Sequence, residues 1–234
     1  MKEFIPENQE SEAIEAVVFD FDGTLATLEI DFGEMRSRLM SLIETFGRPA
    51  SDFPGGYLLE IMGEMHSWLA TTDAGRAEAF MTRAWSIVEG LELEAARKGR
   101  LFPATRPVLE SLRNQGIKLG LITRNFGRAV KLVFPNLADY FAVFLPREAV
   151  RRVKPEPEHL VTALDRLGVV PQRTIMVGDH PIDIETGRRA GTMTAGVATG
   201  RVSRAELAAA GADTTFEHLG QLADWLLHRP PFGS

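Results

Sequence analysis

The sequence predicts an α/β fold in which a parallel sheet is covered by helices on both faces and a smaller all-helical domain is inserted after the first strand. Two observations support this class. From residue 101 onward, short apolar runs alternate with stretches of helical periodicity, which is typical of a parallel sheet packed between helices. Between residues 31 and 100 only helical periodicity appears. A chain of 234 residues has room for one core domain and a smaller insert.

The two patterns also set the expected boundaries. Residues 14–28 and 100–228 should form the α/β core, and residues 29–99 should form the helical insert. Residues 1–13 and 229–234 should be loose ends. Because the insert leaves the core just after the first strand, we expect it to act as a lid over the loop that ends this strand.

Composition excludes several classes of function. The net charge is −6, which argues against a general nucleic-acid binder, because binding to phosphate backbones requires a basic face. The chain has no cysteine, which excludes disulfides and thiolate sites and fits a reducing compartment. No apolar run is long enough to span a bilayer, and the acidic N-terminus lacks the order of a secretion signal. We therefore expect a soluble cytoplasmic protein.

The first expected strand and the helices of the insert follow from local patterns. The apolar residues 17–19 predict a buried strand that ends at Asp20, and Gly23 predicts the turn after it. Asp31 and Asp73 are expected N-caps of two helices in the insert. Apolar residues at helical spacing predict three helices there, covering residues 31–46, 58–69 and 73–91. The charged residues 92–100 are expected to lead out of the insert.

The rest of the core alternates between strands and helices. Glycines close several of the expected helices, Pro181 suits the first turn of one, and Ser203 with Glu206 is typical of a capping box. The expected strands cover residues 118–123, 142–145, 173–177, 192–197 and 212–216. The expected helices cover residues 105–115, 126–134, 156–167, 181–190, a segment after 203, and 217–227.

Polar residues follow three of these strands directly. The first strand ends in Asp20 and Asp22, the next in the run Thr123-Arg124-Asn125, and a later one in Asp179 with Asp183 four residues on. Ligands of open parallel sheets bind at the carboxyl ends of the strands, so these side chains should converge. Lys154 precedes Pro155, which disfavours a helical conformation and places this lysine in a loop; Arg151 and Arg152 are its rivals for the site.

Converging carboxylates would repel one another unless a cation joined them. Oxygen ligands and a phosphate substrate suit Mg²⁺, and Lys154 would add a second positive charge. The hydroxyl of Thr123 and the amides of Arg124 and Asn125 lie where a helix begins, a common position for anion binding. Together these groups predict a site for phosphoryl transfer.

The same residues carry a family resemblance. The chain resembles hydrolases of the haloacid dehalogenase superfamily, in the phosphoglycolate phosphatase-like branch that has a helical cap and a Rossmann-like core. Four of its motifs occur here in the family's order, and the insert occupies the position of the cap. The motifs are the runs Asp20-Phe21-Asp22-Gly23-Thr24, Leu121-Ile122-Thr123-Arg124-Asn125, Lys154-Pro155, and Gly178-Asp179 through Asp183, extended by Ile184, Ala190 and Gly191.

The resemblance implies a role for each residue. Asp20 would be the nucleophile that forms an aspartyl-phosphate, and Asp22 would be the general acid and then the general base. Asp20, the backbone carbonyl of Asp22 and Asp179 would bind Mg²⁺. Asp183 would hold Lys154 or a water molecule on the ion. The phosphoryl group would be held by Thr123, Arg124, Asn125 and Lys154.

Two residues depart from the family pattern. Arg124 stands where Asn more often follows Thr, and it either touches the substrate or lies in solvent on the first turn of a helix. His180 follows the metal aspartate where a small hydroxyl residue is commoner, and it is interpreted as a polar residue at a helix start.

The function that this predicts is a magnesium-dependent phosphatase acting on a small phosphorylated metabolite, such as phosphoglycolate, a sugar phosphate or a nucleotide. The alternatives are a phosphomutase of the β-phosphoglucomutase type on the same scaffold, and a non-hydrolytic phospho-acceptor or binding protein. No nucleic acid or membrane partner is expected, and the protein should be a monomer or a homodimer. The sequence leaves the substrate, the oligomeric state and the pathway open.

Overall fold

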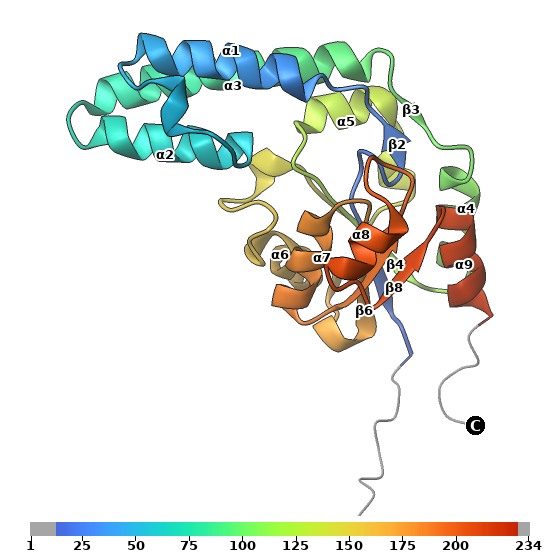
Figure 1. Ribbon diagram of the computed structural model, residues 1–234. Coiled ribbons are helices and arrows are strands. Elements are labelled where there is room, and N and C mark those ends of the chain that lie inside the picture. The colour runs from blue at the N-terminus through green and yellow to red at the C-terminus, as the bar shows by residue number, and fades with distance from the viewer. Residues whose placement is uncertain (1–12, 229–234) are drawn as a thin grey trace, which may run out of the picture. The chain divides into compact units, whose positions relative to one another are not determined.

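The computed structural model describes residues 13–228 (Figure 1). It divides the chain into two compact units, one made of the residues up to Thr27 and from Arg100 onward, the other of Leu28–Gly99. The expected division at residues 28/29 and 99/100 lies within one residue of this one. The loose ends expected at residues 1–13 and 229–234 lie, except for residue 13, outside the described residues. Among residues 13–228, no helix combines the length and the apolar character needed to cross a membrane.

A six-stranded sheet forms the centre of the core unit, in the order β5-β4-β1-β6-β7-β8. Every neighbouring pair is parallel, so the predicted fold class is confirmed. The central strand β1 is fully buried, as its apolar sequence predicts. The strands are β1 (Ala16–Phe19), β4 (Lys118–Ile122), β5 (Val143–Leu145), β6 (Thr174–Gly178), β7 (Met193–Val197) and β8 (Thr214–Phe216).

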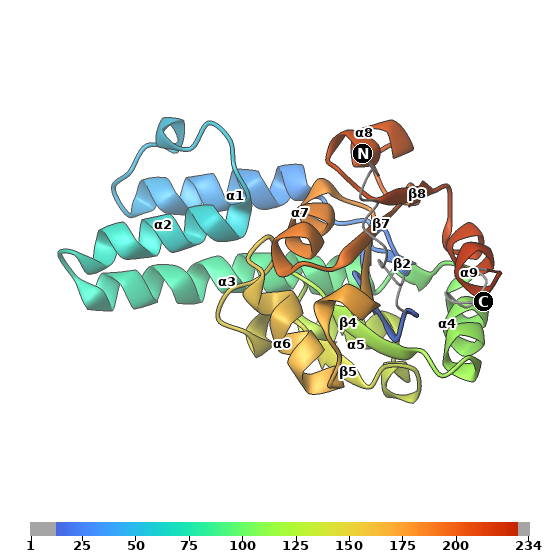
Figure 2. The same ribbon diagram turned by 90° about the horizontal axis from the view of Figure 1, so that it is seen from below.

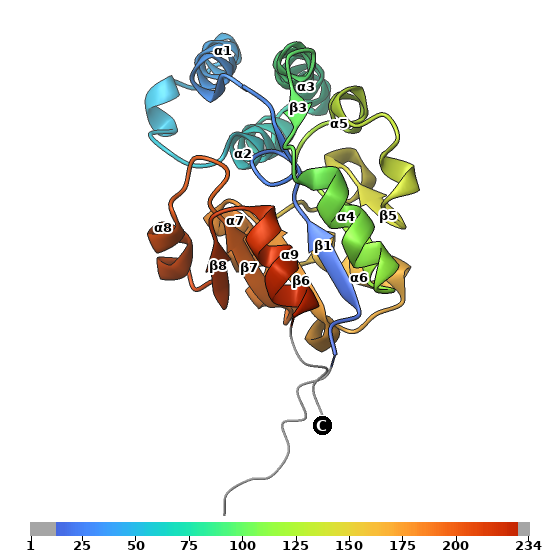
Figure 3. The ribbon, with the colours of Figure 1, turned by 90° about the vertical axis from the view of Figure 1, so that its right-hand side faces the viewer.

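Helices cover both faces of this sheet, as Figure 3 shows. Helices α4 (Thr105–Asn114) and α9 (Leu219–Leu227) pack against each other and against one face. The opposite face carries α6 (Glu158–Leu167), α7 (Pro181–Ala190) and α8 (Arg204–Ala209), where α6 buries an apolar cluster against β1, β4 and β5. The short helix α5 (Gly127–Val133) follows β4. Within residues 13–228, four 3-10 helices add single turns, at Ala50–Asp52, Leu137–Asp139, Arg147–Ala149 and Pro171–Arg173.

A two-stranded ribbon lies where the chain leaves and re-enters the core. Strands β2 (Ala26–Thr27) and β3 (Arg100–Leu101) pair antiparallel, with Ala26 opposite Leu101. This ribbon is not predicted from the sequence, because two residues per strand are too few to show a period of alternation. Its pairing joins residues that are far apart in the sequence.

The insert consists of three helices, α1 (Phe32–Thr45), α2 (Leu58–Ala70) and α3 (Ala74–Ala96), which run beside one another in Figure 2. Buried methionine, leucine and phenylalanine side chains fill the space between them, as the helical spacing predicts. The third helix is longer than expected. Glu92 is buried within it, and the helix continues through most of the stretch that was expected to lead out of the insert.

The predicted caps are present. Asp31 accepts a hydrogen bond from the backbone N–H of Glu34 at 2.8 Å, and Asp73 accepts one from Arg76 at 3.0 Å. Ser203 and Glu206 form the reciprocal capping box, since each side chain accepts a hydrogen bond from the other residue's backbone N–H. These local signals depend on residues three positions apart, which is why sequence alone identifies them.

Candidate active site

Three strands that are followed by polar residues end at the same edge of the sheet. Asp20 follows β1, Thr123 follows β4 and Asp179 follows β6. Strand β1 lies between the other two, and its last residue, Phe19, pairs with Leu121 on one side and Val177 on the other. The three strands therefore end at nearly the same level of the sheet. The chain passes from β1 to β4 and β5 on one side and then crosses to β6 on the other, so a switch in strand order lies beside Asp20.

Lys154 joins two of the predicted aspartates. Its Nζ donates hydrogen bonds to Oδ1 of Asp20 and Oδ1 of Asp183, each at 2.6 Å, and the residue is 1 % exposed. Burial acts to lower the pKa of this ammonium, but the charges of Asp183 and Asp20 outweigh it and raise the pKa above 10.5. The rival cations Arg151 and Arg152 are exposed. The lysine therefore stays charged between two carboxylates.

An acidic cluster surrounds this lysine. Carboxylate oxygens of Asp20, Asp179 and Asp183 all lie within 4.8 Å of one another. Burial raises the pKa of Asp20 to about 6, although the charge of Lys154 opposes the rise. Burial and repulsion from Asp20 and Asp183 raise the pKa of Asp179 to about 8. Three carboxylates meet one ammonium here, which leaves an excess of negative charge, and an all-oxygen donor set suits a hard divalent cation. The residues therefore fit the expected Mg²⁺.

Asp183 belongs to this cluster, whereas the side chain of Asp22 lies beside it. The side chain of Asp22 is not one of the three that meet, but its charge is among those that raise the pKa of Asp179, so it lies nearby. Asp183 is fully buried, and its Oδ2 accepts a hydrogen bond from the backbone N–H of His180 at 3.2 Å. Since Oδ1 already accepts from Lys154, both oxygens of Asp183 are engaged within the protein. This arrangement suits a residue that holds the lysine.

Close packing around Asp179 depends on the loop after β1. Gly23 has φ +84°, and a Cβ added there would lie 2.2 Å from Oδ2 of Asp179. The next residue, Thr24, donates a hydrogen bond to Oδ1 of Asp179 at 3.0 Å. Thr199, which follows β7, donates to the carbonyl of Gly23 at 2.6 Å. Neither Thr24 nor Thr199 is among the predicted site residues, although Thr199 follows a strand of the same sheet and the strand-end rule applies to it equally.

The polar groups of the segment after β4 form hydrogen bonds within the protein. Thr123 is buried; its hydroxyl donates to Oδ1 of Asn125 at 2.9 Å and accepts from the Asn125 backbone N–H at 3.1 Å. The backbone N–H of Gly127, at the start of α5, donates to Glu148 at 3.0 Å. Phosphate binding by Thr123, Arg124 and Asn125 stays a prediction, in which the substrate would replace the internal partners of Thr123.

Arg124 and His180 have defined positions. Nη1 of Arg124 donates to the backbone carbonyl of Lys154, so this guanidinium contacts the lysine loop. His180 is the N-cap of α7, with its Nδ1 accepting from the backbone N–H of Ile182 at 3.2 Å. Burial lowers the pKa of His180, which favours the neutral ring that this cap requires. The interpretation of His180 as a polar residue at a helix start agrees with this geometry.

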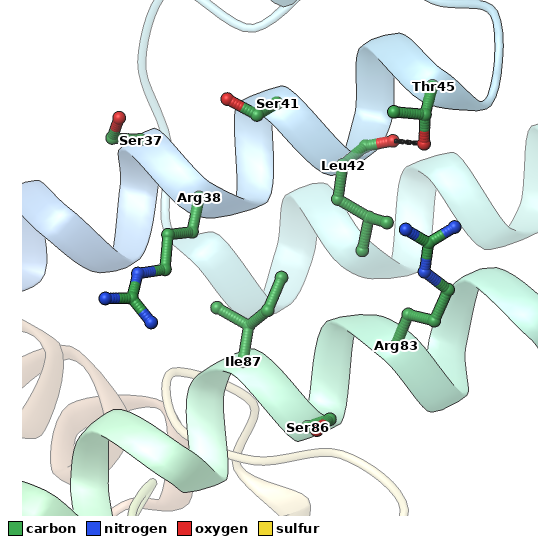
Figure 4. Close-up of a pocket in the computed structure, with 8 residues that line it drawn as sticks. All are labelled: Ser37, Arg38, Ser41, Leu42, Thr45, Arg83, Ser86 and Ile87. Atoms are coloured by element: carbon green, nitrogen blue, oxygen red, sulfur yellow. Dashed lines mark hydrogen bonds between the residues drawn. The ribbon is translucent and has the colours of Figure 1, made fainter.

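A separate hollow lies in the insert, between α1 and α3, with a volume of about 520 Å³. Figure 4 shows Leu42 and Ile87 pointing toward each other from the two helices, with Arg38 and Arg83 beside them. The remaining lining residues are Ser37, Ser41, Thr45 and Ser86. None of the eight lining residues is a carboxylate, so this hollow is chemically distinct from the acidic cluster of the core.

Comparison with known proteins decides the family. A model of the haloacid dehalogenase-like hydrolases matches residues 14–191, which include all four motifs. The chain belongs to this family. It is therefore an enzyme of a hydrolase family, as the resemblance of its motifs implies.

Two named relatives align with most of this chain. Pyrophosphatase PpaX of Bacillus cereus is 29 % identical over 217 residues, covering 89 % of this chain and 94 % of the relative. A phosphoglycolate phosphatase of Cupriavidus necator is 29 % identical over 221 residues, covering 88 % and 90 %. A Thermotoga maritima protein named as a beta-phosphoglucomutase shares the fold, with a TM-score of 0.61 and 24 % identity over 93 % of this chain and 100 % of that one.

Proposed function

We propose that this protein is a magnesium-dependent phosphatase that hydrolyses a small phosphorylated metabolite through an aspartyl-phosphate on Asp20. The observation that carries the proposal is the position of Lys154, whose Nζ lies 2.6 Å from both Asp20 and Asp183 inside the acidic cluster. A buried cation held against a strand-end carboxylate can offset the negative charge that otherwise keeps a phosphate away from that carboxylate.

Asp20 is suited to attack phosphorus. In the first step a carboxylate oxygen of Asp20 bonds to phosphorus while the ester P–O bond breaks, and Asp22 gives its proton to the leaving alcohol oxygen. In the second step Asp22 takes a proton from water, the water oxygen bonds to phosphorus, and the bond between Asp20 and phosphorus breaks to release phosphate. Asp20 must be ionised to begin, and its pKa of about 6 allows this at neutral pH.

Charge neutralisation is divided between the lysine and the metal. Lys154 holds the nucleophile and offers its remaining N–H to a phosphoryl oxygen. Asp20, Asp179 and the backbone carbonyl of Asp22 would hold Mg²⁺, which when bound supplies positive charge to the carboxylates and to the phosphoryl group. Thr24 fixes one oxygen of Asp179 and so limits the orientations of that ligand.

The relatives suggest which substrates to test. Their names, pyrophosphatase and phosphoglycolate phosphatase, point to small anions that carry a phosphoryl group. The deciding experiment measures phosphate release from a panel of 2-phosphoglycolate, inorganic pyrophosphate, sugar phosphates, nucleotides and p-nitrophenyl phosphate. We expect turnover that requires added Mg²⁺ and stops in excess chelator. Unchanged turnover in chelator would contradict the role of the metal.

Two substitutions test the nucleophile in the same assay. Asp20→Asn keeps the shape of the side chain and removes the attacking oxygen anion, so turnover should fall to background while the circular dichroism spectrum stays unchanged. The matched control is Asp165→Asn on the exposed surface of α6, which should keep wild-type activity. If Asp20→Asn retained near wild-type turnover, the nucleophile would have to be another residue.

A phosphomutase on the same scaffold is the alternative function. The likeness to the protein named as a beta-phosphoglucomutase concerns the fold, at 24 % identity. Incubation with glucose 1-phosphate separates the two reactions, since a hydrolase releases free phosphate and a mutase produces an isomer. We expect free phosphate. The lid role of the insert, the cytoplasmic location and the monomeric or homodimeric state stay predictions.

A further inference from the structure

Lys154 is held by its backbone as well as by its ammonium group. Its backbone N–H donates to Nδ1 of His159 at 3.3 Å, and its carbonyl accepts from Nη1 of Arg124. The backbone N–H and the backbone carbonyl of Lys154 are therefore each bound by a side chain. Neither bond belongs to a helix or strand, and both come from residues that the proposed chemistry does not use.

Both residues are themselves held in place, His159 through its ring and Arg124 through its backbone carbonyl. His159 is fully buried, and its Nε2 lies 3.0 Å from the carbonyl of Leu145, at the end of β5. Because Nδ1 must accept from Lys154, the proton lies on Nε2, which then donates to Leu145. Burial lowers the pKa of His159 to about 3, so this single tautomer persists at neutral pH. On the other side, Nη1 of Arg147 donates to the carbonyl of Arg124 at 3.2 Å.

We propose that His159 and Arg124 are positioning residues that fix the Lys154 backbone and thereby hold its ammonium group between Asp20 and Asp183. The inference rests on the proposed function, because it assigns Lys154 its place in that chemistry. It also gives Arg124 a role other than substrate binding, the question that the sequence leaves open. The loop from Val153 to Pro157 has no strand pairing, so these two side chains replace the ladder that fixes β1 just before Asp20.

The geometry explains why backbone fixation matters for a lysine. Its side chain has four rotatable bonds, so small shifts of the backbone move Nζ by larger amounts. Both hydrogen bonds of Nζ are 2.6 Å long, which leaves little room for such shifts. Groups that orient a functional residue are typically worth about 10- to 100-fold in activity.

Matched pairs of substitutions test each side of the backbone. His159→Asn places an acceptor oxygen where Nδ1 lies, whereas His159→Leu introduces a side chain of about the size of histidine that has no acceptor. His159→Leu should lower kcat by about 10- to 100-fold, and His159→Asn should restore most of it. Arg124→Met should lower kcat by a similar factor, and Arg124→Lys should retain more. In each case KM should change less than kcat. The matched control, Arg128→Met on the exposed face of α5, should keep wild-type kcat.

A second measurement does not depend on activity. Lys154 is buried, whereas Lys98, Lys118 and Lys131 are exposed, so an amine-reactive reagent should label these exposed lysines and spare Lys154 in the wild-type protein. His159→Leu and Arg124→Met should make Lys154 reactive at temperatures where melting curves show both variants folded. Peptide mass spectrometry gives the ratio of the labelled sites.

The two measurements separate the possible failures. If the wild-type protein hydrolyses no phosphate ester but the variants expose Lys154, the proposed function is wrong and the positioning role stands. If His159→Leu and Arg124→Met keep kcat within about twofold and leave Lys154 unlabelled, the positioning role is wrong. Equal losses in His159→Leu and His159→Asn, in proportion to their melting temperatures, would show a structural role only.

Discussion

Replacing Lys154 with methionine tests how far one buried cation holds the site together. The lysine side chain is 2 % exposed and lies 2.6 Å from two carboxylates, of which Asp183 is fully buried. Removing one partner of a buried ion pair typically costs about 3–5 kcal/mol, because the remaining charge stays buried without compensation. We therefore expect Lys154→Met to lower the free energy of unfolding by about 3–5 kcal/mol at pH 8 in the presence of chelator.

A second substitution shows whether the loss has this origin. In the variant Lys154→Met, Asp183→Asn, the stranded charge is removed while the side-chain oxygen that caps α7 is kept. This variant should recover about 2 kcal/mol or more relative to Lys154→Met alone. The control is Lys131→Met, which removes an exposed lysine and should cost no more than about 1 kcal/mol.

The pH dependence has a definite sign. The folded-state pKa of Asp20 is already raised from 3.8 to about 6 with Lys154 present, and removing the lysine raises it further. A carboxyl group with a raised folded pKa destabilises the protein most at a pH above that pKa, and the effect disappears as the pH falls toward 3.8. The deficit of Lys154→Met should therefore shrink between pH 8 and pH 4.

Urea denaturation followed by circular dichroism measures these differences by linear extrapolation. The reasoning would be refuted if Lys154→Met unfolded within about 1 kcal/mol of the wild-type protein, a loss no larger than that of the exposed control. It would also be refuted if Asp183→Asn gave no recovery in the Lys154→Met background, because the stranded carboxylate would then not be the source of the loss.

Three further predictions use the same unfolding assays. Without metal, the free energy of unfolding should fall as pH rises from 4 to 8, by at most about 1.4 kcal/mol per pH unit for each carboxyl group. Because the pKa of Asp179 is raised to about 8, Asp179→Asn should flatten this pH dependence. The same substitution should abolish the stabilisation of the protein by Mg²⁺. Gly178→Ala should cost about 1–3 kcal/mol or more, since its Cβ would lie 2.2 Å from Cγ of Asp183. Ser203→Ala should cost about 1 kcal/mol through the lost N-cap, and equal melting temperatures would contradict that role.

Local pattern was enough to define the fold class and the main elements of this protein. The apolar run before Asp20, the helical spacing of the insert and the capping pair of Ser203 and Glu206 each act over a few residues. Such signals survive in the sequence because they depend on backbone geometry and on neighbours in the chain. The two-residue strands β2 and β3 were missed because their pairing is set by partners far away in the sequence.

The candidate site was predictable as a set of strand ends, but its internal arrangement was not. The rule that ligands bind at the carboxyl ends of parallel strands groups Asp20, Thr123 and Asp179 from sequence alone. It does not show which side chains touch. Only the tertiary structure places Asp183 rather than the Asp22 side chain among the meeting carboxylates, because that depends on how α7 packs after β6.

The lysine illustrates the division most clearly. Sequence identifies Lys154 beside Pro155, whereas its contacts with Asp20 and Asp183 span 134 and 29 residues. His159 left no signal in the sequence, because a histidine within a helix looks like any other helical residue until its ring is seen between the Lys154 loop and the end of β5. Sequence determines which residues are available to the site; the tertiary structure decides which of them meet, because burial and charge act between atoms that only folding brings together.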